Sequence, residues 1–116
     1  SDFVHPERHP GWAERFRPQM RYDGFGHALL SSLRNVMTQD SLPDFREIAD
    51  HATPVLLVWG RRDSVLPFAQ SEAVRGAIPA AQFLAVDEAG HLPHLEQTDS
   101  VASALIAFLG EDGMQR

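Results

Sequence analysis

The stretch PVLLVWG at residues 54–60 decides the predicted fold. Its apolar residues stand at consecutive positions, and a proline and a glycine bound them. This composition is typical of a strand in a parallel sheet that helices cover on both faces. A second short strand is predicted at residues 81–87, AQFLAVD, with a helix over residues 67–77 between the two. The strand–helix–strand order predicts a parallel pair with a right-handed crossover.

Helices are predicted on either side of this unit. Apolar residues recur at helical spacing over residues 24–38, with Asp23 as the N-cap, and over 98–109, with Gly110 just beyond the end. The remaining segments are predicted as a short helix over 12–16, a connector with one helical turn at Pro43 over 41–54, and a loop over 88–97. The fold class is therefore α/β, with two parallel strands and flanking helices. Two strands are too few for a stable isolated sheet, so we expect that these strands form one end of a larger α/β sheet.

The composition restricts the classes of partner. The 116 residues have the size of one domain, and a net charge of −6 argues against binding to nucleic-acid phosphates. The absence of cysteine excludes disulfides and thiolate metal sites. No apolar run approaches the roughly 18 residues of a membrane span, and the first residues lack the layout of a signal peptide. We expect a cytoplasmic protein with no nucleic-acid or membrane partner.

Two residues with the chemistry of catalysis follow the predicted strands. Asp63 lies three residues after the first strand, and His91 lies four residues after the second. Chemistry in open parallel sheets collects beyond the carboxyl ends of the strands, where neighbouring loops meet. A carboxylate that accepts the Nδ1 proton of an imidazole fixes its tautomer and stabilises the imidazolium formed in catalysis. Asp63 and His91 are therefore the predicted catalytic residues.

The segments PVLLVWGRRDSVLP and FLAVDEAGHLPHLEQTDSVASALIAFL resemble the C-terminal portion of the α/β-hydrolase fold superfamily. The resemblance rests on two motifs at this spacing, W-G-x-x-D-x-x-x-P and G-H-x-x-x-x-E. It implies that Asp63 is the acid and His91 the base of a Ser/Asp/His triad. It also implies that residues 1–22 are the remnant of a cap region and that residues 23–116 are the C-terminal part of the hydrolase domain.

The nucleophile that the resemblance requires is missing from this sequence. The family carries it in a G-x-S-x-G elbow upstream of the acid, and no such pentapeptide occurs here. Six of the serines lie on predicted helices or beside Asp63 and are poor candidates: Ser31, Ser32, Ser64, Ser71, Ser100 and Ser103. We therefore expect a C-terminal fragment of a hydrolase that is inactive alone. The resemblance implies that the intact parent would cleave an ester, amide, C–C or related bond of a small molecule without a metal or organic cofactor. Its nucleophile could also be an aspartate in place of the serine.

Other interpretations of these residues are structural. Asp63 could have no role other than to cap the following turn, and His91 could be a loop histidine with a structural hydrogen bond. Glu96 is expected to favour a helix dipole or to pair with an arginine. A metal site is a poor interpretation of His91 and His94 with Glu88 or Glu96, because the spacing of these residues does not fix a third ligand. Trp59 is expected in the core.

A second function class stays open for the isolated chain. A non-catalytic truncated domain could act as a self-associating or partner-binding module, because its sheet would be uncovered. This hypothesis predicts self-association, or a complementary chain that covers the exposed sheet.

Overall fold

The computed structural model describes residues 1–114, with the surroundings of the side chains described for residues 1–110. The chain forms two compact units. The sheet unit contains residues 1–6 and the chain from residue 42 onward, and the helical unit contains residues 7–41. This division does not test the predicted cap boundary between residues 22 and 23, which stays a prediction.

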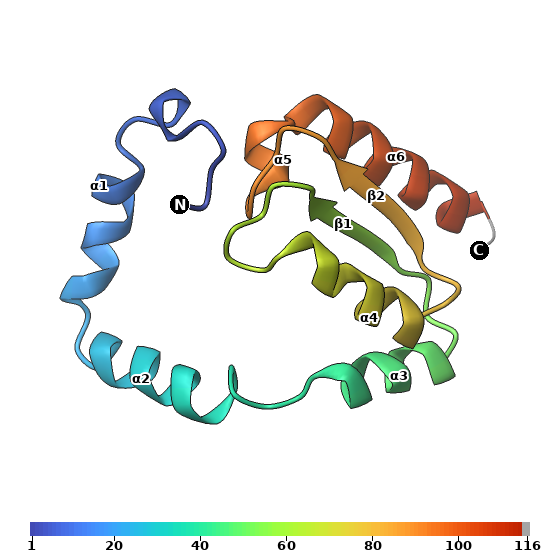
Figure 1. Ribbon diagram of the computed structural model, residues 1–116, viewed down its shortest axis with the longest axis horizontal. Coiled ribbons are helices and arrows are strands. Elements are labelled where there is room, and N and C mark those ends of the chain that lie inside the picture. Colours follow the sequence, from blue (N-terminus) through green and yellow to red (C-terminus); the bar gives the residue numbers. More distant parts are fainter. Residues whose placement is uncertain (115–116) are drawn as a thin grey trace. The chain divides into compact units, whose positions relative to one another are not determined.

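The sheet unit contains the predicted parallel pair (Figure 1). Strand β1 (Leu56–Gly60) pairs with strand β2 (Gln82–Val86), and the register places Leu56 opposite Gln82 and Gly60 opposite Val86. A 3-10 turn (Phe68–Gln70) and helix α4 (Ser71–Ala77) connect the two strands. The α/β fold class, with two parallel strands and flanking helices, is confirmed.

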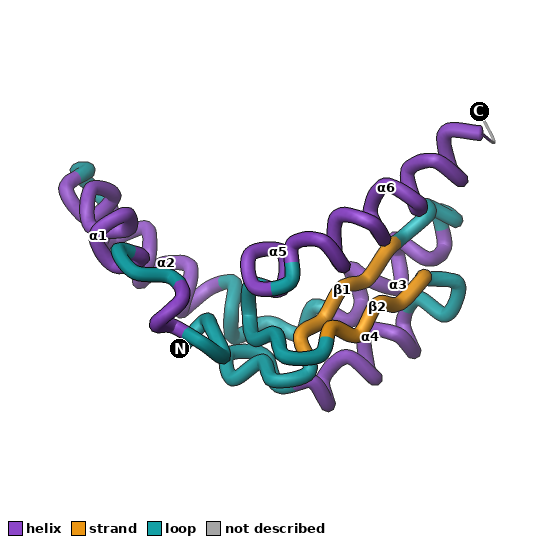
Figure 2. Tube along the Cα trace, turned by 90° about the horizontal axis from the view of Figure 1, so that it is seen from above, coloured by secondary structure: helices purple, strands orange, loops and turns teal. Residues whose placement is uncertain are grey.

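Helices lie on both sides of this sheet. Figure 2 shows α6 (Thr98–Met114) on one side and α4 on the other. Helix α3 (Leu42–Asp50) packs against α4, and the one-turn helix α5 (Pro93–Glu96) precedes α6. The buried apolar residues of the unit are Phe3, Ala77, Ile78, Val86 and Ala89. Residues 56–59 of β1 are only half-buried, so the predicted burial of this strand on both faces is not reached within the described chain.

Several helix predictions were wrong in detail. The connector contains a full nine-residue helix, α3, because Leu42, Phe45 and Ala49 recur at helical spacing and are half-buried. Helix α6 continues through Gly110 to Met114, so this glycine does not end it. The N-cap of α2 is Gly24 in the left-handed region, with φ of 82°, and not Asp23. The residues 93–96, predicted within a loop, form α5.

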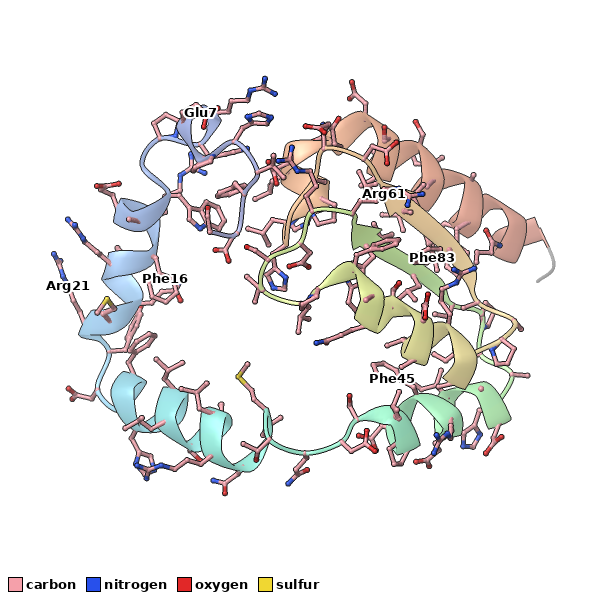
Figure 3. The ribbon with its side chains drawn as sticks, viewed as in Figure 1. Glu7, Phe16, Arg21, Phe45, Arg61 and Phe83 are labelled. Atoms are coloured by element: carbon pink, nitrogen blue, oxygen red, sulfur yellow. The ribbon has the colours of Figure 1, made fainter. Side chains whose placement is uncertain are left out.

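The helical unit contains α1 (Trp12–Phe16), a 3-10 helix (Arg17–Arg21) and α2 (Phe25–Asn35), which is shorter than predicted. A further 3-10 turn at Pro6–Arg8 lies at its boundary. The rings of Phe16, labelled in Figure 3, and Phe25 meet edge to face, with centroids 5.9 Å apart. None of the helices within residues 1–114 has both the length and the apolar character that a bilayer crossing requires.

Candidate active site

The loops that carry the predicted catalytic residues begin side by side. The strands end in register at Gly60 and Val86, and the Arg62 N–H donates to the Ala89 carbonyl at 3.0 Å. A Cβ on Gly60 would overlap the carbonyl oxygens of Ala89 and Gly90. Only a residue without a side chain fits at this contact, so Gly60 allows the two loops to approach.

The acid loop (residues 61–67) holds Asp63 by local hydrogen bonds. Its Oδ1 accepts the backbone N–H groups of Val65 at 2.8 Å and Leu66 at 2.9 Å. Aspartate commonly closes a turn in this way, by bonding to the backbone a few residues on. These bonds leave Oδ2 directed at His91 Nδ1, which lies 3.1 Å away. The side chain of Asp63 is only 6% exposed, so the contact is shielded from water.

The electrostatics of Asp63 favour its charged form. Burial acts to raise the pKa of this carboxyl, but the hydrogen bonds from the Leu66 N–H, from His91 and from the Val65 N–H together lower the pKa below its usual value of 3.8. An ionised carboxylate can only accept hydrogen bonds, so Nδ1 of His91 carries the hydrogen in this pair. In the neutral ring, Nε2 is then a proton acceptor.

The histidine loop (residues 87–92) leaves one ring nitrogen open for chemistry. The side chain of His91 is 32% exposed, and Asp63 binds its Nδ1. No hydrogen bond to Nε2 forms among the residues that the structure describes. The backbone N–H of His91 donates to the Asp2 carbonyl at 2.8 Å. The arrangement therefore presents an oriented imidazole that could take a proton at Nε2.

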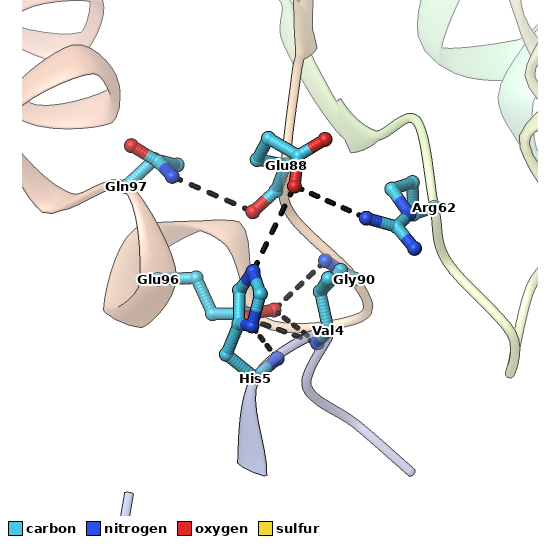
Figure 4. A network of polar contacts seen from close by, with 7 residues as sticks. All are labelled: Val4, His5, Arg62, Glu88, Gly90, Glu96 and Gln97. Atoms are coloured by element: carbon cyan, nitrogen blue, oxygen red, sulfur yellow. Dashed lines mark hydrogen bonds and ion pairs between the residues drawn. The ribbon is translucent and has the colours of Figure 1, made fainter. Parts of the chain in front are cut away.

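The structure brings together both residues that the sequence predicted for the site. Asp63 and His91 form a hydrogen-bonded pair, and Asp63 also caps its own turn through the other oxygen. Their catalytic role stays a prediction. The two glutamates considered as metal ligands have other contacts, Glu88 with Arg62 and Glu96 with backbone N–H groups (Figure 4). Residues 1–110 contain no cluster of three His, Asp or Glu side chains suited to a metal ion.

Sequence reasoning missed two residues that support the pair. Trp59 was expected in the core, but it is half-buried and its indole N–H donates to the Leu66 carbonyl at 3.0 Å, behind the turn that holds Asp63. Glu96 was expected near a helix dipole or an arginine, and its carboxylate accepts backbone N–H groups from two distant segments. Glu96 is the last position of the motif G-H-x-x-x-x-E, so the sequence marked this residue, but no sequence pattern identified the groups that it binds.

Comparison with known families identifies the fold family of this chain. The family model for the alpha/beta hydrolase fold matches residues 3–98, which include both strands, both loops and the N-terminal residues beside them. The chain belongs to the alpha/beta hydrolase fold family.

Relatives of this alpha/beta hydrolase chain are several times longer. It is 30% identical over 84 residues to Lipase 3 of Moraxella sp. (strain TA144), covering 72% of this chain and 26% of that protein. It is 41% identical over 64 residues to the pimeloyl-[acyl-carrier protein] methyl ester esterase of Xanthomonas campestris pv. campestris, covering 55% of this chain and 25% of that one. The chain thus spans about a quarter of the length of these curated relatives.

A solved structure supports the fold assignment alone. MGS-M2, an alpha/beta hydrolase enzyme from a Medee basin deep-sea metagenome library, superposes with a TM-score of 0.69 at 18% identity. The superposition covers 91% of this chain and 39% of MGS-M2. Most of this chain therefore has a structural counterpart within a larger alpha/beta hydrolase domain.

Proposed function

We propose that this chain supplies the acid and the histidine of a Ser/Asp/His triad, and that the nucleophile of the hydrolase lies outside residues 1–116. One observation carries the proposal. The buried Asp63 carboxylate lies 3.1 Å from His91 Nδ1, while Nε2 stays free of partners among the described residues. A general base needs this arrangement, with one ring nitrogen oriented by a carboxylate and the other free to reach the nucleophile.

In the proposed reaction, His91 transfers protons at Nε2. It takes the hydroxyl proton as the serine oxygen attacks the carbonyl carbon of an ester, and it then gives that proton to the leaving alcohol. In the second half it takes a proton from water, whose oxygen attacks the acyl-enzyme, and it returns this proton to the serine. Asp63 holds the ring and stabilises the imidazolium formed in each half. An ester is the favoured substrate class because relatives include a lipase and a methyl ester esterase.

The first test uses the chain as it stands. The 116 residues should show no hydrolysis of p-nitrophenyl butyrate above the rate of a His91→Ala variant, because the nucleophile is absent. A rate that disappears in His91→Ala would mean that a serine of this chain reacts and would overturn the proposed division of the triad.

The second test uses the whole protein encoded by the reading frame that contains residues 1–116. We expect this protein to hydrolyse p-nitrophenyl esters, and His91→Ala to lower kcat by about 10⁴-fold or more. Asp63→Asn should lower kcat by up to about 10⁴-fold with a small change in KM, because it disturbs the tautomer of His91 and not substrate binding. A hydrolysis rate that His91→Ala leaves unchanged would contradict the proposal.

A second candidate function is self-association without catalysis. One observation favours it: Leu105, Ile106 and Leu109 of α6 are exposed, Ile106 by 71%, beside a sheet that is only half-buried. Exposed apolar surface of this kind often marks an interface. Light scattering during size-exclusion chromatography of the 116 residues should then give a dimer or larger assembly, and a monomer at high concentration would argue against this function.

A further inference from the structure

The Glu96 carboxylate binds two segments that are far apart in the chain. Its Oε1 accepts the Gly90 N–H at 2.8 Å, and its two oxygens accept the Val4 N–H at 3.1 and 3.0 Å. A longer contact of 3.3 Å joins Oε2 to the His5 N–H (Figure 4). Hydrogen bonds to a charged acceptor are about twice as strong as neutral ones. The glutamate therefore joins the histidine loop to the N-terminal segment, residues 1–5.

These contacts surround the backbone of His91. Gly90, bound by Glu96, directly precedes the histidine, and the His91 N–H donates to the Asp2 carbonyl at 2.8 Å. Asp2 is two residues before Val4, which Glu96 also binds. The hydrogen bonds thus close a ring that runs from Glu96 through Gly90 and His91 to the N-terminal segment and back. The position of the imidazole depends on this ring, because the ring fixes the backbone N–H groups of Gly90 and of His91 itself.

Close packing supports the same contact. A Cβ on Gly90 would lie 2.8 Å from the Asp2 oxygen and 3.3 Å from Glu96 Oε1, so the two segments touch without a side chain between them. Phe3 is 6% exposed and anchors the N-terminal segment in the core. The Ser64 hydroxyl donates to the Ser1 carbonyl at 2.9 Å, so this segment also contacts the acid loop.

We propose that Glu96 is a positioning residue for the proposed general base. It binds the N-terminal segment to the histidine loop and thereby keeps His91 Nδ1 within hydrogen-bonding distance of Asp63. The inference rests on the proposed function for the role of His91, but the positioning itself is independent of hydrolysis. A base displaced by about 1 Å can lose about 100-fold in rate, so a residue that fixes the backbone beside it affects catalysis without touching substrate.

The test is nuclear magnetic resonance of the 116-residue chain, which reports position without activity. The wild-type chain should give a low-field proton signal from His91 Nδ1–H that disappears in Asp63→Asn. Glu96→Gln should remove or weaken this signal and speed amide exchange at Gly90 and His91 by about 10-fold to 100-fold, because a neutral amide accepts these bonds less strongly. Amides of β1 and β2 should change less than about twofold.

Glu88→Gln is the matched control. It removes a carboxylate from the same polar network, where Glu88 contacts Arg62 at 3.1 Å and His5 at 3.7 Å, but it leaves the Gly90 contact in place. The His91 signal should persist in this variant, with Gly90 exchange within about twofold of wild type.

Three results would overturn the proposal. The first is a His91 signal and Gly90 exchange that Glu96→Gln leaves unchanged, and the second is a wild-type chain without an Asp63-dependent Nδ1–H signal. If Glu96→Gln does not fold, a variant lacking residues 1–5 replaces it, because it removes the Asp2 carbonyl and two donors to Glu96. This variant should lose the signal too, and its persistence is the third contrary result. A failed esterase assay would instead contradict only the proposed function.

Discussion

The acid loop and the histidine loop hold their functional residues in different ways. Asp63 is fixed by the N–H groups two and three positions further along, in a turn that Trp59 supports through the Leu66 carbonyl. His91 is fixed by Asp2 and Glu96, and Asp2 is 89 positions away in the chain. The first arrangement is local and the second is tertiary. We therefore expect the turn around Asp63 to form from contacts close to it in the chain. The histidine loop should take up its conformation only when the rest of the sheet unit is folded.

The largest effect is expected at the point where the two loops meet. Gly60→Ala would place a methyl group on the carbonyls of Ala89 and Gly90, which are backbone atoms and cannot rotate away. Overpacking of this kind costs about 3 kcal/mol or more of unfolding free energy, measured by urea denaturation. The nearest carbon of this contact, that of the Ala89 carbonyl, would lie 2.8 Å from the new Cβ.

A glycine elsewhere in the same unit provides the control. Gly76 lies in α4, and a Cβ there would meet no atom within 4 Å. Gly76→Ala should raise the unfolding free energy by about 0.5–1 kcal/mol, since alanine loses less backbone entropy in a helix. Equal effects of the two substitutions would show that the loops do not depend on close approach at Gly60.

The next largest effect concerns the bond that joins the two loops. Asp63→Asn keeps an oxygen for the Val65 and Leu66 N–H groups but removes the charged partner of His91. We expect a loss of about 2 kcal/mol at pH 7, the value for a hydrogen bond to a charged group. Urea denaturation gives the difference in unfolding free energy between wild type and variant.

This difference should depend on the charge of Asp63. Because the folded-state pKa of Asp63 is lowered from 3.8, its stabilising contribution is fully present above that value and is lost as the pH falls through the folded-state pKa. The gap between wild type and Asp63→Asn should therefore shrink as the pH falls below 3.8. A gap that does not shrink below pH 3.8 would mean that the carboxylate is not held by these bonds.

A smaller and strictly local effect is expected at Trp59. Trp59→Phe removes the donor to the Leu66 carbonyl and should cost about 1 kcal/mol. Amide exchange should accelerate at Val65 and Leu66 but not at Gly90. Faster exchange at Gly90 in Trp59→Phe would show that the two loops are not supported separately.

The local features are those that the sequence predicted. Consecutive apolar residues bounded by Pro54 and Gly60 predicted β1, and the spacing of Asp63 and His91 from the strand ends predicted their meeting. Both depend on neighbours in the chain or on the general geometry of parallel sheets. Helix α3 was underestimated because its apolar residues are few and polar residues separate them.

The tertiary features were beyond a pattern-based prediction. Residues 1–5 have no periodicity, and nothing in them indicates that Asp2 would bind the His91 backbone. Glu96 has a side chain that could contact a dipole, an arginine or backbone N–H groups, and only the fold selects among these. The support of the histidine loop therefore became visible only when residues distant in sequence were placed together.

The smallest effect is expected where the two loops are linked at the surface. Arg61 Nε lies 2.7 Å from the Asp87 carboxylate, but these side chains are 53% and 82% exposed. Water and salt screen such a pair, so a double-mutant cycle of Arg61→Ala and Asp87→Ala should give a coupling below about 0.5 kcal/mol that falls further in 0.5 M salt. A coupling above about 2 kcal/mol would give this ion pair the same weight as the buried bond of Asp63 to His91. The surface ion pair would then stabilise the two loops as much as the local turn and the tertiary contacts do. The acid loop could no longer be described as locally supported and the histidine loop as supported by tertiary contacts.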